Sequence, residues 1–358
     1  MKIFHSDRHR LRDAQTELDA GRFVRPYESP SRVEMVRAEL ERRGLGPFET
    51  PGAFGRAAYE RIHDPLYLAF LESAWADWAA AKRGADGAIH GEAIPNIWPS
   101  RRMGRRPDLS RPDLDIEVKL GWYALAAETA ISNGTWEAAC ASADLALSAQ
   151  AAVAEAAVAG GAPAAFALCR PPGHHAAADM FGGYCFLNNA ALAAQGFIDQ
   201  GAGRVAVLDV DFHHGNGTQS IFYERADVLT VSIHGDPDFA FPYYLGAADE
   251  TGAGAGEGAN LNLPLAKGAA WDAWSGALDQ ACARIEAFGA AALVVSLGVD
   301  AYEGDPISQF RLTGEDFIRM GARIGGLRRP TVLVMEGGYA VEAIGVNVAN
   351  ALEGLAGA

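Results

Sequence analysis

The stretch Arg204-Val-Ala-Val-Leu-Asp-Val-Asp-Phe-His-His-Gly-Asn-Gly217 decides the fold of this chain and the place of its chemistry. It begins with a short apolar run rich in β-branched residues, which is typical of a buried strand in a parallel sheet. It then brings together two carboxylates, two imidazoles and two glycines. In open α/β sheets, ligands bind at the carboxyl ends of the strands. The stretch therefore predicts an α/β domain with its active site just after this strand.

The carboxylates and imidazoles have the spacing of metal ligands. Residues two apart on an extended strand point to the same side, so Asp209, Asp211 and His213 can project together. Asp-x-His supplies two of the three protein ligands of an open catalytic zinc site. We expect the third to be Asp300, because Gly298 lets the backbone turn sharply after another apolar run. This set suits zinc, and also iron(II) or cobalt(II). Solvated loop residues are the alternative interpretation, which fits a lone Asp or His better than this whole pattern.

Two adjacent histidines on another loop are the expected proton-transfer groups. His174 and His175 each need a hydrogen-bond partner, and Asp209 and Asn216 are the natural candidates. An aspartate partner favours the imidazolium and an asparagine does not, so the two histidines are predicted to titrate differently. Tyr339 follows two glycines and is expected to donate to a developing oxyanion. Ordinary packing is the alternative for this tyrosine taken alone.

Composition sets broad limits on function. The chain has 358 residues, of which 49% are hydrophobic and 21% charged, as in soluble globular proteins. Its net charge of −15 argues against a protein that wraps DNA or binds anionic membranes, and it is compatible with a small cationic ligand. We see no signal peptide and no long apolar span. The four cysteines form no C-x-x-C pair, which favours a reduced, cytoplasmic setting.

Strands alternate with helices along the chain, which predicts a three-layer α/β fold with a mainly parallel sheet and one catalytic domain over residues 1–358. We expect Ser31 to cap a helix with Glu34 as its capping-box partner. Loops are expected at 11–30 and at the glycine-rich run 252–258. Expected strands are 2–5, 163–169, 204–207, 228–233, 291–298 and 331–335, and expected helices are 31–43, 66–82, 187–200, 271–288, 317–324 and 341–355, with two more within 121–159.

Residues 84–115 are the least regular part and are predicted to be an insertion loop. Four arginines lie in it among prolines and glycines: Arg101, Arg102, Arg105 and Arg106. Nucleic-acid binding fits poorly with the acidic remainder of the chain. We expect this loop to order the fold or to form an oligomer contact.

These motifs resemble the arginase/deacetylase superfamily, and specifically the histone deacetylase-like amidohydrolases. The matching stretches occur in the family's order from about residue 163 onward, and Ile62-His-Asp-Pro-Leu-Tyr67 resembles its N-terminal segment. The stretches are Arg170-Pro-Pro-Gly-His-His175, Gly182-Gly-Tyr-Cys-Phe186, Asp209 to Asn216, Ser296-Leu-Gly-Val-Asp300 and Glu336-Gly-Gly-Tyr339.

The resemblance implies a role for each matching residue. Asp211, His213 and Asp300 would bind zinc, and His175 would be the general base and acid. His174, paired with Asp209, would act electrostatically, and Tyr339 would polarise the acetyl carbonyl. A structural potassium ion would lie near Asp209, Ser232 and the backbones of Asp211 and His213. Asn216 differs from the aspartate of class I enzymes and is similar to the class II pattern. The acyl-amine channel would be lined by Gly183, Tyr184 and Phe241.

Within this family, the chain is most similar to bacterial acetylpolyamine amidohydrolases. Thr16-Glu-Leu18, Asp115-Ile-Glu117, Ala127-Glu-Thr-Ala130 and the long insertion carry that similarity. It implies a homodimer in which the insertion narrows the channel. It also implies that the acidic residues Glu17, Glu117 and Glu128 meet a small cationic acetylated amine. Each glutamate taken alone fits a solvated surface residue better.

Two alternatives stay open at this point. One is an acetyl-lysine protein deacetylase of class II type, which needs an open channel mouth. The other is a catalytically silent binding protein, which predicts the loss of a metal ligand, of His175 or of Tyr339. All of these residues are present.

Overall fold

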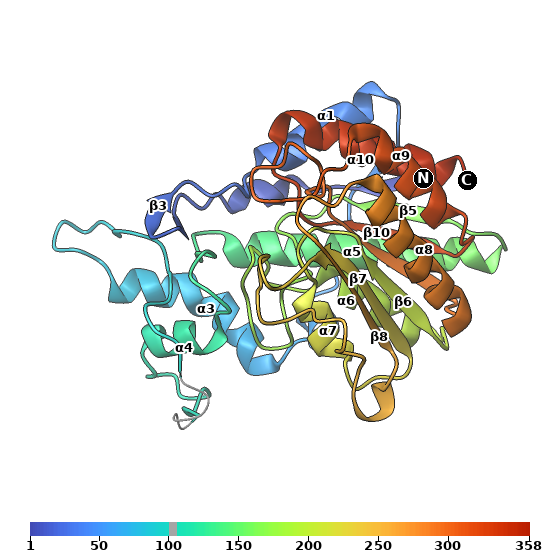
Figure 1. Ribbon diagram of the computed structural model, residues 1–358. Coiled ribbons are helices and arrows are strands. Elements are labelled where there is room, and N and C mark those ends of the chain that lie inside the picture. The colour runs from blue at the N-terminus through green and yellow to red at the C-terminus, as the bar shows by residue number, and fades with distance from the viewer. Residues whose placement is uncertain (100–105) are drawn as a thin grey trace.

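An eight-stranded parallel sheet forms the centre of the molecule (Figure 1). The computed structural model describes residues 1–99 and 106–358. From one edge to the other, the strands are β4 (Phe48–Glu49), β1 (Lys2–Phe4), β5 (Ala164–Ala167), β10 (Thr331–Met335), β9 (Ala292–Leu297), β6 (Val205–Asp209), β7 (Val228–Gly235) and β8 (Asn260–Leu265). All seven neighbouring pairs are parallel, so their carboxyl ends lie at one edge.

Helices cover the sheet in the three-layer arrangement that the sequence predicts. One group packs α5 (Thr135–Val158) against α6 (Asn189–Asp199), and both helices contact strands of the sheet. The other group is a contiguous series, with α8 (Trp271–Phe288) against β7 and β8 and, beyond it, α9 (Gly314–Gly325), α10 (Val341–Ala356) and α1 (Ser31–Arg42). Figure 1 shows this second group at the upper right of the sheet.

A smaller part projects from one side of the sheet, at the left in Figure 1. It holds α3 (Pro65–Ala81), α4 (Ile116–Tyr123) and the described residues between them, which form neither helix nor strand. The Asp64 side chain caps α3 by accepting hydrogen bonds from the backbone N–H groups of Leu66 and Tyr67, as the Asp-Pro start predicts. The remaining elements are α2 (Arg56–Tyr59), α7 (Asn216–Phe222), the 3₁₀ turns η1 (Asp7–Leu11) and η2 (Gly254–Gly256), and the antiparallel pair β2 (Glu17–Asp19) and β3 (Arg22–Val24).

Some local expectations were wrong. Ser31 does not cap α1, because Pro30 is its N-cap residue and the Ser31 hydroxyl pairs with Ser29 instead. The expected loop at 11–30 contains the β2–β3 hairpin. Within 121–159 only α5 is a long helix, since α4 ends at Tyr123 and 124–134 is irregular.

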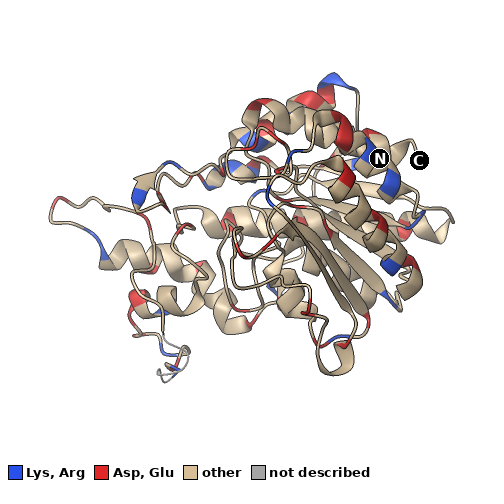
Figure 2. Cartoon of the chain, in the orientation of Figure 1, with Lys and Arg blue, Asp and Glu red and all other residues tan. Residues whose placement is uncertain are grey.

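Lysines and arginines are interspersed with aspartates and glutamates over the outer helices (Figure 2), so those among the described residues form no single basic face in this view. Arg101, Arg102 and Arg105 lie outside the described residues. Among the residues that are described, no helix has the length and apolar character needed to cross a membrane.

Candidate active site

Neighbouring strands bring the predicted chemical groups to one edge of the sheet. Asp209 is the last residue of β6, which lies beside β9 and β7. The register pairs Asp209 with Ser296 of β9 and with Ser232 of β7. Asp300 is the third residue after the end of β9, and Tyr339 follows β10. Because parallel strands end at the same edge, residues far apart in the sequence meet there.

The three predicted metal ligands form a buried cluster. One donor atom from each of Asp211, His213 and Asp300 lies within 4.8 Å of the other two. The His213 Nδ1 atom is 3.2 Å from Asp211 Oδ1 and 3.0 Å from Asp300 Oδ2. Two carboxylates and one imidazole form a donor set that suits a divalent metal such as zinc.

The electrostatics of this cluster also fit a cation. Burial, and then the Asp211 charge, raise the pKa of Asp300 to about 8. Burial alone would lower the pKa of His213, but its hydrogen bonds to Asp211 and Asp300 raise it to about 10. Two fully buried carboxylates beside a single imidazole are costly unless a positive charge compensates them. The backbone closes tightly around the cluster, since a Cβ on Gly337 would lie 2.4 Å from Asp300 Oδ2 and 2.5 Å from Asp211 Oδ2.

The two adjacent histidines have the partners that the sequence predicts. The Nδ1 atom of His174 is 2.9 Å from Asp209 Oδ2, and that of His175 is 2.7 Å from Asn216 Oδ1. Burial opposes the charged form of His174, but the Asp209 charge raises its pKa to about 10. Burial, and then the His174 charge, hold the pKa of His175 well below its ordinary value. The pKa of His174 is thus raised and that of His175 lowered, so the two histidines titrate differently, as the sequence predicts.

Tyr339 is buried near Asp211 and Asp300 and keeps its proton. Burial raises the pKa of its hydroxyl well above the ordinary value. The Arg32 guanidinium lies 4.7 Å from the centre of the Tyr339 ring and donates to the carbonyl of Gly338. Asp305 accepts a 2.7 Å hydrogen bond from the Tyr339 backbone N–H. Tyr339 is thus held by contacts to its ring and backbone, and its hydroxyl stays protonated.

A cavity of about 670 Å³ opens over these groups. His175, His213 and Tyr339 are among the residues that line it, and so are five of the six residues predicted to contact substrate: Glu17, Glu128, Gly183, Tyr184 and Phe241. The Phe241 ring stands edge-on to His175 with the ring centres 5.1 Å apart. A Cβ on Gly183 would lie 2.1 Å from the His175 ring, so only glycine fits there.

Two carboxylates lie in the wall of this cavity. Glu17 is buried, and both of its oxygens lie 2.8 Å from the Tyr184 hydroxyl, which donates to them. Glu128 is half-buried and accepts hydrogen bonds from the Gly183 N–H and the Thr129 hydroxyl. Burial raises the pKa of Glu17 to about 7, although the Tyr184 hydrogen bond opposes the shift. The wall therefore presents acidic groups to whatever enters.

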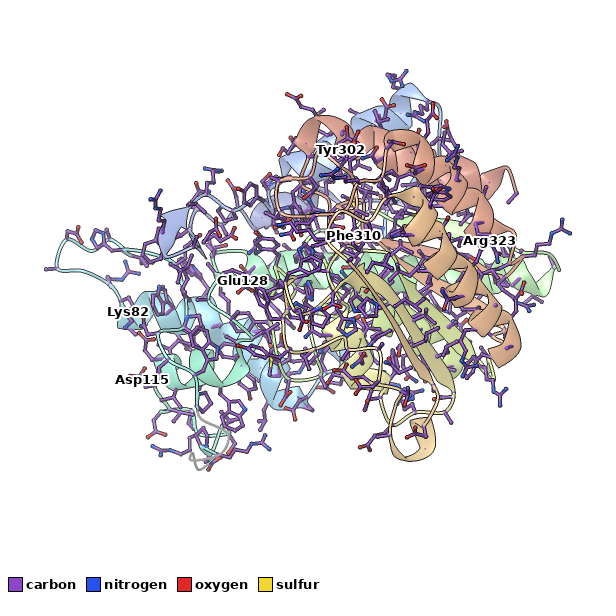
Figure 3. All side chains as sticks on the ribbon, in the orientation of Figure 1. Lys82, Asp115, Glu128, Tyr302, Phe310 and Arg323 are labelled. Carbon is purple, nitrogen blue, oxygen red and sulfur yellow. The ribbon has the colours of Figure 1, made fainter. Side chains whose placement is uncertain are left out.

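Glu117 lies apart from this cavity within a single chain. Its carboxylate accepts hydrogen bonds from Lys82 at 2.6 Å and from Asn96 at 3.0 Å. Figure 3 shows Lys82 and Asp115 on the projecting part, whereas Glu128 lies nearer to the sheet. The assignment of Glu117 to substrate binding stays a prediction.

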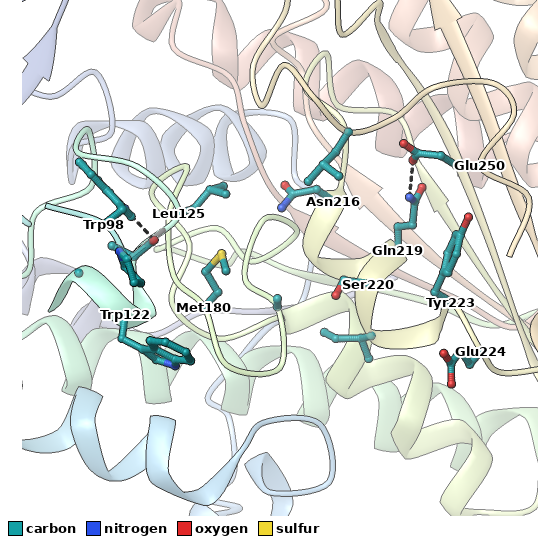
Figure 4. A pocket seen from close by; sticks show the side chains of 16 residues that line it. Trp98, Trp122, Leu125, Met180, Asn216, Gln219, Ser220, Tyr223, Glu224 and Glu250 are labelled. Carbon is teal, nitrogen blue, oxygen red and sulfur yellow. Dashed lines mark hydrogen bonds between the residues drawn. The ribbon is translucent and has the colours of Figure 1, made fainter. Parts of the chain in front are cut away.

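A second, larger cavity of about 1020 Å³ lies on the side of α7 and α4 (Figure 4). Its walls include Trp98, Trp122, Met180 and Glu224, and Asn216 also borders it. Asn216 is the only one of the predicted catalytic residues among its lining residues. The space beside Asn216 is therefore not filled by packed side chains.

Several residues that support the site were not predicted. Glu28 is fully buried and forms ion pairs with the three arginines Arg12, Arg32 and Arg170. Glu336 accepts hydrogen bonds from the backbone N–H groups of Gly173 and His174, and so fixes the histidine loop. Arg170 and Glu336 lie inside the quoted motifs, and Asp305 lies in a Gly-Asp-Pro turn. These positions could have pointed to the three residues from the sequence. Nothing in the sequence singles out Glu28 or Arg32.

Comparison with known proteins agrees with this geometry. Residues 26–355 match the family model described as the histone deacetylase domain. The chain is 52% identical to acetylpolyamine amidohydrolase 2 of Pseudomonas aeruginosa, over 100% of this chain and 99% of that protein. It is 51% identical to acetylpolyamine amidohydrolase of Mycoplana ramosa, over 100% of both.

A solved structure agrees in fold as well. It is the acetylpolyamine aminohydrolase of Burkholderia pseudomallei, with a TM-score of 0.90 and 40% identity over 99% of this chain and 98% of that one. The family model spans nearly the whole chain, and these relatives cover it completely. The chain therefore belongs to the histone deacetylase family of amide-hydrolysing enzymes.

Proposed function

We propose that this protein is a zinc-dependent amidohydrolase that removes acetyl groups from acetylated polyamines or related aliphatic amines. One observation carries the proposal. A single cavity is lined by His175 and Tyr339, by His213 of the Asp211–His213–Asp300 cluster, and by Glu17 and Glu128. The names of the relatives, which are acetylpolyamine amidohydrolases, support the same substrate class.

Each group in the cavity has a place in the hydrolysis. A zinc ion held by the three ligands would lower the pKa of a water molecule and polarise the acetyl carbonyl. His175 is neutral and can accept the proton of the attacking water, and it can return a proton to the leaving amine. His174 stays positively charged and stabilises negative charge beside it. The Tyr339 hydroxyl donates to the oxyanion that develops on the carbonyl.

The wall of the cavity favours a thin cationic chain. Tyr184 and Phe241 supply aromatic surface for methylene groups, and Glu17 and Glu128 supply negative charge for a distant ammonium. A desolvated carboxylate attracts a cation more strongly than a solvated one does. The second candidate is an acetyl-lysine protein deacetylase of class II type. It is supported by Asn216, the hydrogen-bond partner of His175, because an asparagine at this position is similar to the class II pattern.

We further propose a structural potassium ion beside the metal site. A void of about 10 Å³ is lined by Asp209, Ser232, His214 and neighbouring groups. A space of this size is close to the minimum for one water-sized particle. The register places Asp209 directly opposite Ser232, so their oxygens can share an ion.

Residues 1–358 are proposed to act as one catalytic domain that forms a homodimer through the 84–115 insertion. Exposed apolar side chains on the insertion and near the cavity support this, since Ile97 is 71% exposed and Tyr244, in the cavity lining, is 96% exposed. A cytoplasmic setting is supported by four cysteines that form no disulfide.

The test is product formation from N-acetylputrescine. We expect the zinc-loaded protein to release acetate and putrescine in equal amounts. Removal of the metal with a chelator should stop turnover, and added zinc should restore it. The His175→Ala variant should keep its zinc and lose turnover. Undiminished hydrolysis by the metal-free protein would contradict the proposal.

A further inference from the structure

A second group of metal-binding side chains lies at the start of the chain, outside the active site. His5, Asp7 and His9 each bring one donor atom to within 4.8 Å of the other two. They come together because β1 ends at Phe4 and η1 begins at Asp7, so the chain turns back on itself. His5 Nε2 is 4.0 Å from Asp7 Oδ1, and the ring centres of His5 and His9 are 5.9 Å apart.

His9 is the unusual member of this group. It is only 2% exposed, and neither of its ring nitrogens has a hydrogen-bond partner within the described residues. Buried polar atoms without partners cost free energy, so a native structure rarely keeps two on one ring without a reason. Burial, and then the nearby Arg170 charge, lower the pKa of His9 to about 3, which leaves a neutral imidazole. A neutral imidazole is the form that binds a metal.

Two arginines beside the cluster are already engaged by carboxylates. The Arg10 Nη1 atom is 3.3 Å from Asp7, and its Nε donates to Glu34. The Arg37 Nη1 atom is 3.7 Å from Asp7, and its Nε donates to Glu41. The carboxylates Asp7, Glu34 and Glu41 thus face these two guanidinium groups, and the Arg37 Nη1 atom is also 3.5 Å from His5 Nδ1. A third nearby guanidinium, that of Arg170, is paired with Glu28.

We propose that His5, Asp7 and His9 form a second divalent-metal site for ions of the zinc class. Two imidazoles and one carboxylate are a donor set that zinc, cobalt(II), nickel(II) and copper(II) accept. Tetrahedral ligands at about 2.05 Å from a metal lie about 3.3 Å apart. Asp7 is 67% exposed at its side chain, so a change of rotamer can bring its carboxylate closer to the two imidazoles.

The bound metal would tie strand β1 to the turn η1. The His9 carbonyl accepts a hydrogen bond from Arg170, the first residue of the loop that carries His174 and His175. The site is therefore joined through one arginine to the catalytic histidine loop. Its expected effect is to stabilise the fold without taking part in hydrolysis.

The experiment is a metal titration of the holoenzyme already loaded with one zinc per chain. Equilibrium dialysis against ZnCl₂, with metal counted by mass spectrometry, should show uptake of a second equivalent by the wild type. The exposed substitution Asp7→Asn and the partly buried His5→Ala should each weaken this uptake at least tenfold. His90→Ala is the matched control, because His90 forms an exposed pair with Asp86 at 3.0 Å and should not affect uptake.

A structural readout accompanies the titration. The second zinc equivalent should raise the Tm of the wild type and of His90→Ala, and should leave the Tm of Asp7→Asn unchanged. Turnover of all variants should equal that of the wild type. Uptake of one equivalent only, or a second equivalent that persists in both Asp7→Asn and His5→Ala, would overturn the proposed site and leave the active-site assignment untouched.

Discussion

The substitution Asn216→Asp tests which histidine accepts the proton. The Asn216 Oδ1 atom lies 2.7 Å from His175 Nδ1, so the substitution places a carboxylate against that ring. Asn216 also borders the second cavity, so the interaction is partly solvated and an effective dielectric constant of about 20 is appropriate. Two unit charges about 4 Å apart then interact with about 4 kcal/mol. This corresponds to about 3 pKa units at about 1.36 kcal/mol each.

The direction of the effect follows from the role of His175. A base must be neutral to accept a proton, and a neighbouring carboxylate raises its pKa. The acidic limb of the pH profile of kcat/KM should therefore move to higher pH, by about 1–3 units once solvation is allowed for. The surface variant Asn133→Asp adds the same charge at an exposed turn and should leave the limb in place. An acidic limb in Asn216→Asp that coincides with that of the wild type would refute His175 as the base.

Three further predictions concern other parts of the site. Tyr339→Phe removes an oxyanion donor and should lower kcat by about 10²–10³ with zinc still bound. The control Tyr184→Phe removes a hydroxyl that is hydrogen-bonded to Glu17 and should lower kcat far less. Steady-state kinetics measure both variants, and equal losses of kcat would remove Tyr339 from the mechanism. Burial raises the pKa of Glu17 to about 7, so its carboxylate becomes charged as the pH rises. KM for a cationic acetylpolyamine should therefore fall between pH 6 and pH 8 in the wild type and stay level in Glu17→Gln. For the control substrate, a neutral acetamide of similar length, KM should not show this fall. Glu28→Gln leaves three buried guanidinium groups without their carboxylate. It should lower the free energy of unfolding, measured by urea titration, by about 3–5 kcal/mol. A loss below about 1 kcal/mol would contradict a stabilising role of these ion pairs.

The core strands could be predicted because strands buried on both faces have a recognisable sequence pattern. β10 and α8 have the predicted bounds, and β9 differs by one residue at each end. Such strands are continuous apolar runs of β-branched residues, bounded by glycine or proline. The polar groups of the site stand directly after these runs, which is why the Asp211–His213–Asp300 cluster and the hydrogen-bond partners of the two histidines were also predictable.

Strands at the edges of the sheet and in the small hairpin were harder to predict from the sequence. β8 at Asn260–Leu265 alternates polar and apolar residues and contains Pro264, so it reads as a continuation of the glycine-rich loop before it. Proline occurs in sheets mainly on edge strands, and β8 is an edge strand. The β2–β3 hairpin was missed because its strands have only three residues each.

Long-range contacts of residues outside the motifs could not be read from the sequence. Arg32 donates to the carbonyls of Gly338 and Glu336, more than 300 residues away. Its position in α1 looks like any surface arginine of a helix until the fold brings α1 against the loop after β10. The same holds for Glu117, whose contact with Lys82 depends on how α3 and α4 pack.

The most direct test of the central claim compares two substrates. We would measure kcat/KM of the zinc-loaded protein for an acetylated polyamine and for an acetyl-lysine peptide, side by side. The acidic cavity predicts a preference of about a hundredfold for the polyamine, which is about 2.7 kcal/mol of differential transition-state binding. Equal values, or a preference for the peptide, would contradict the role given to Glu17 and Glu128 while leaving the metal chemistry intact.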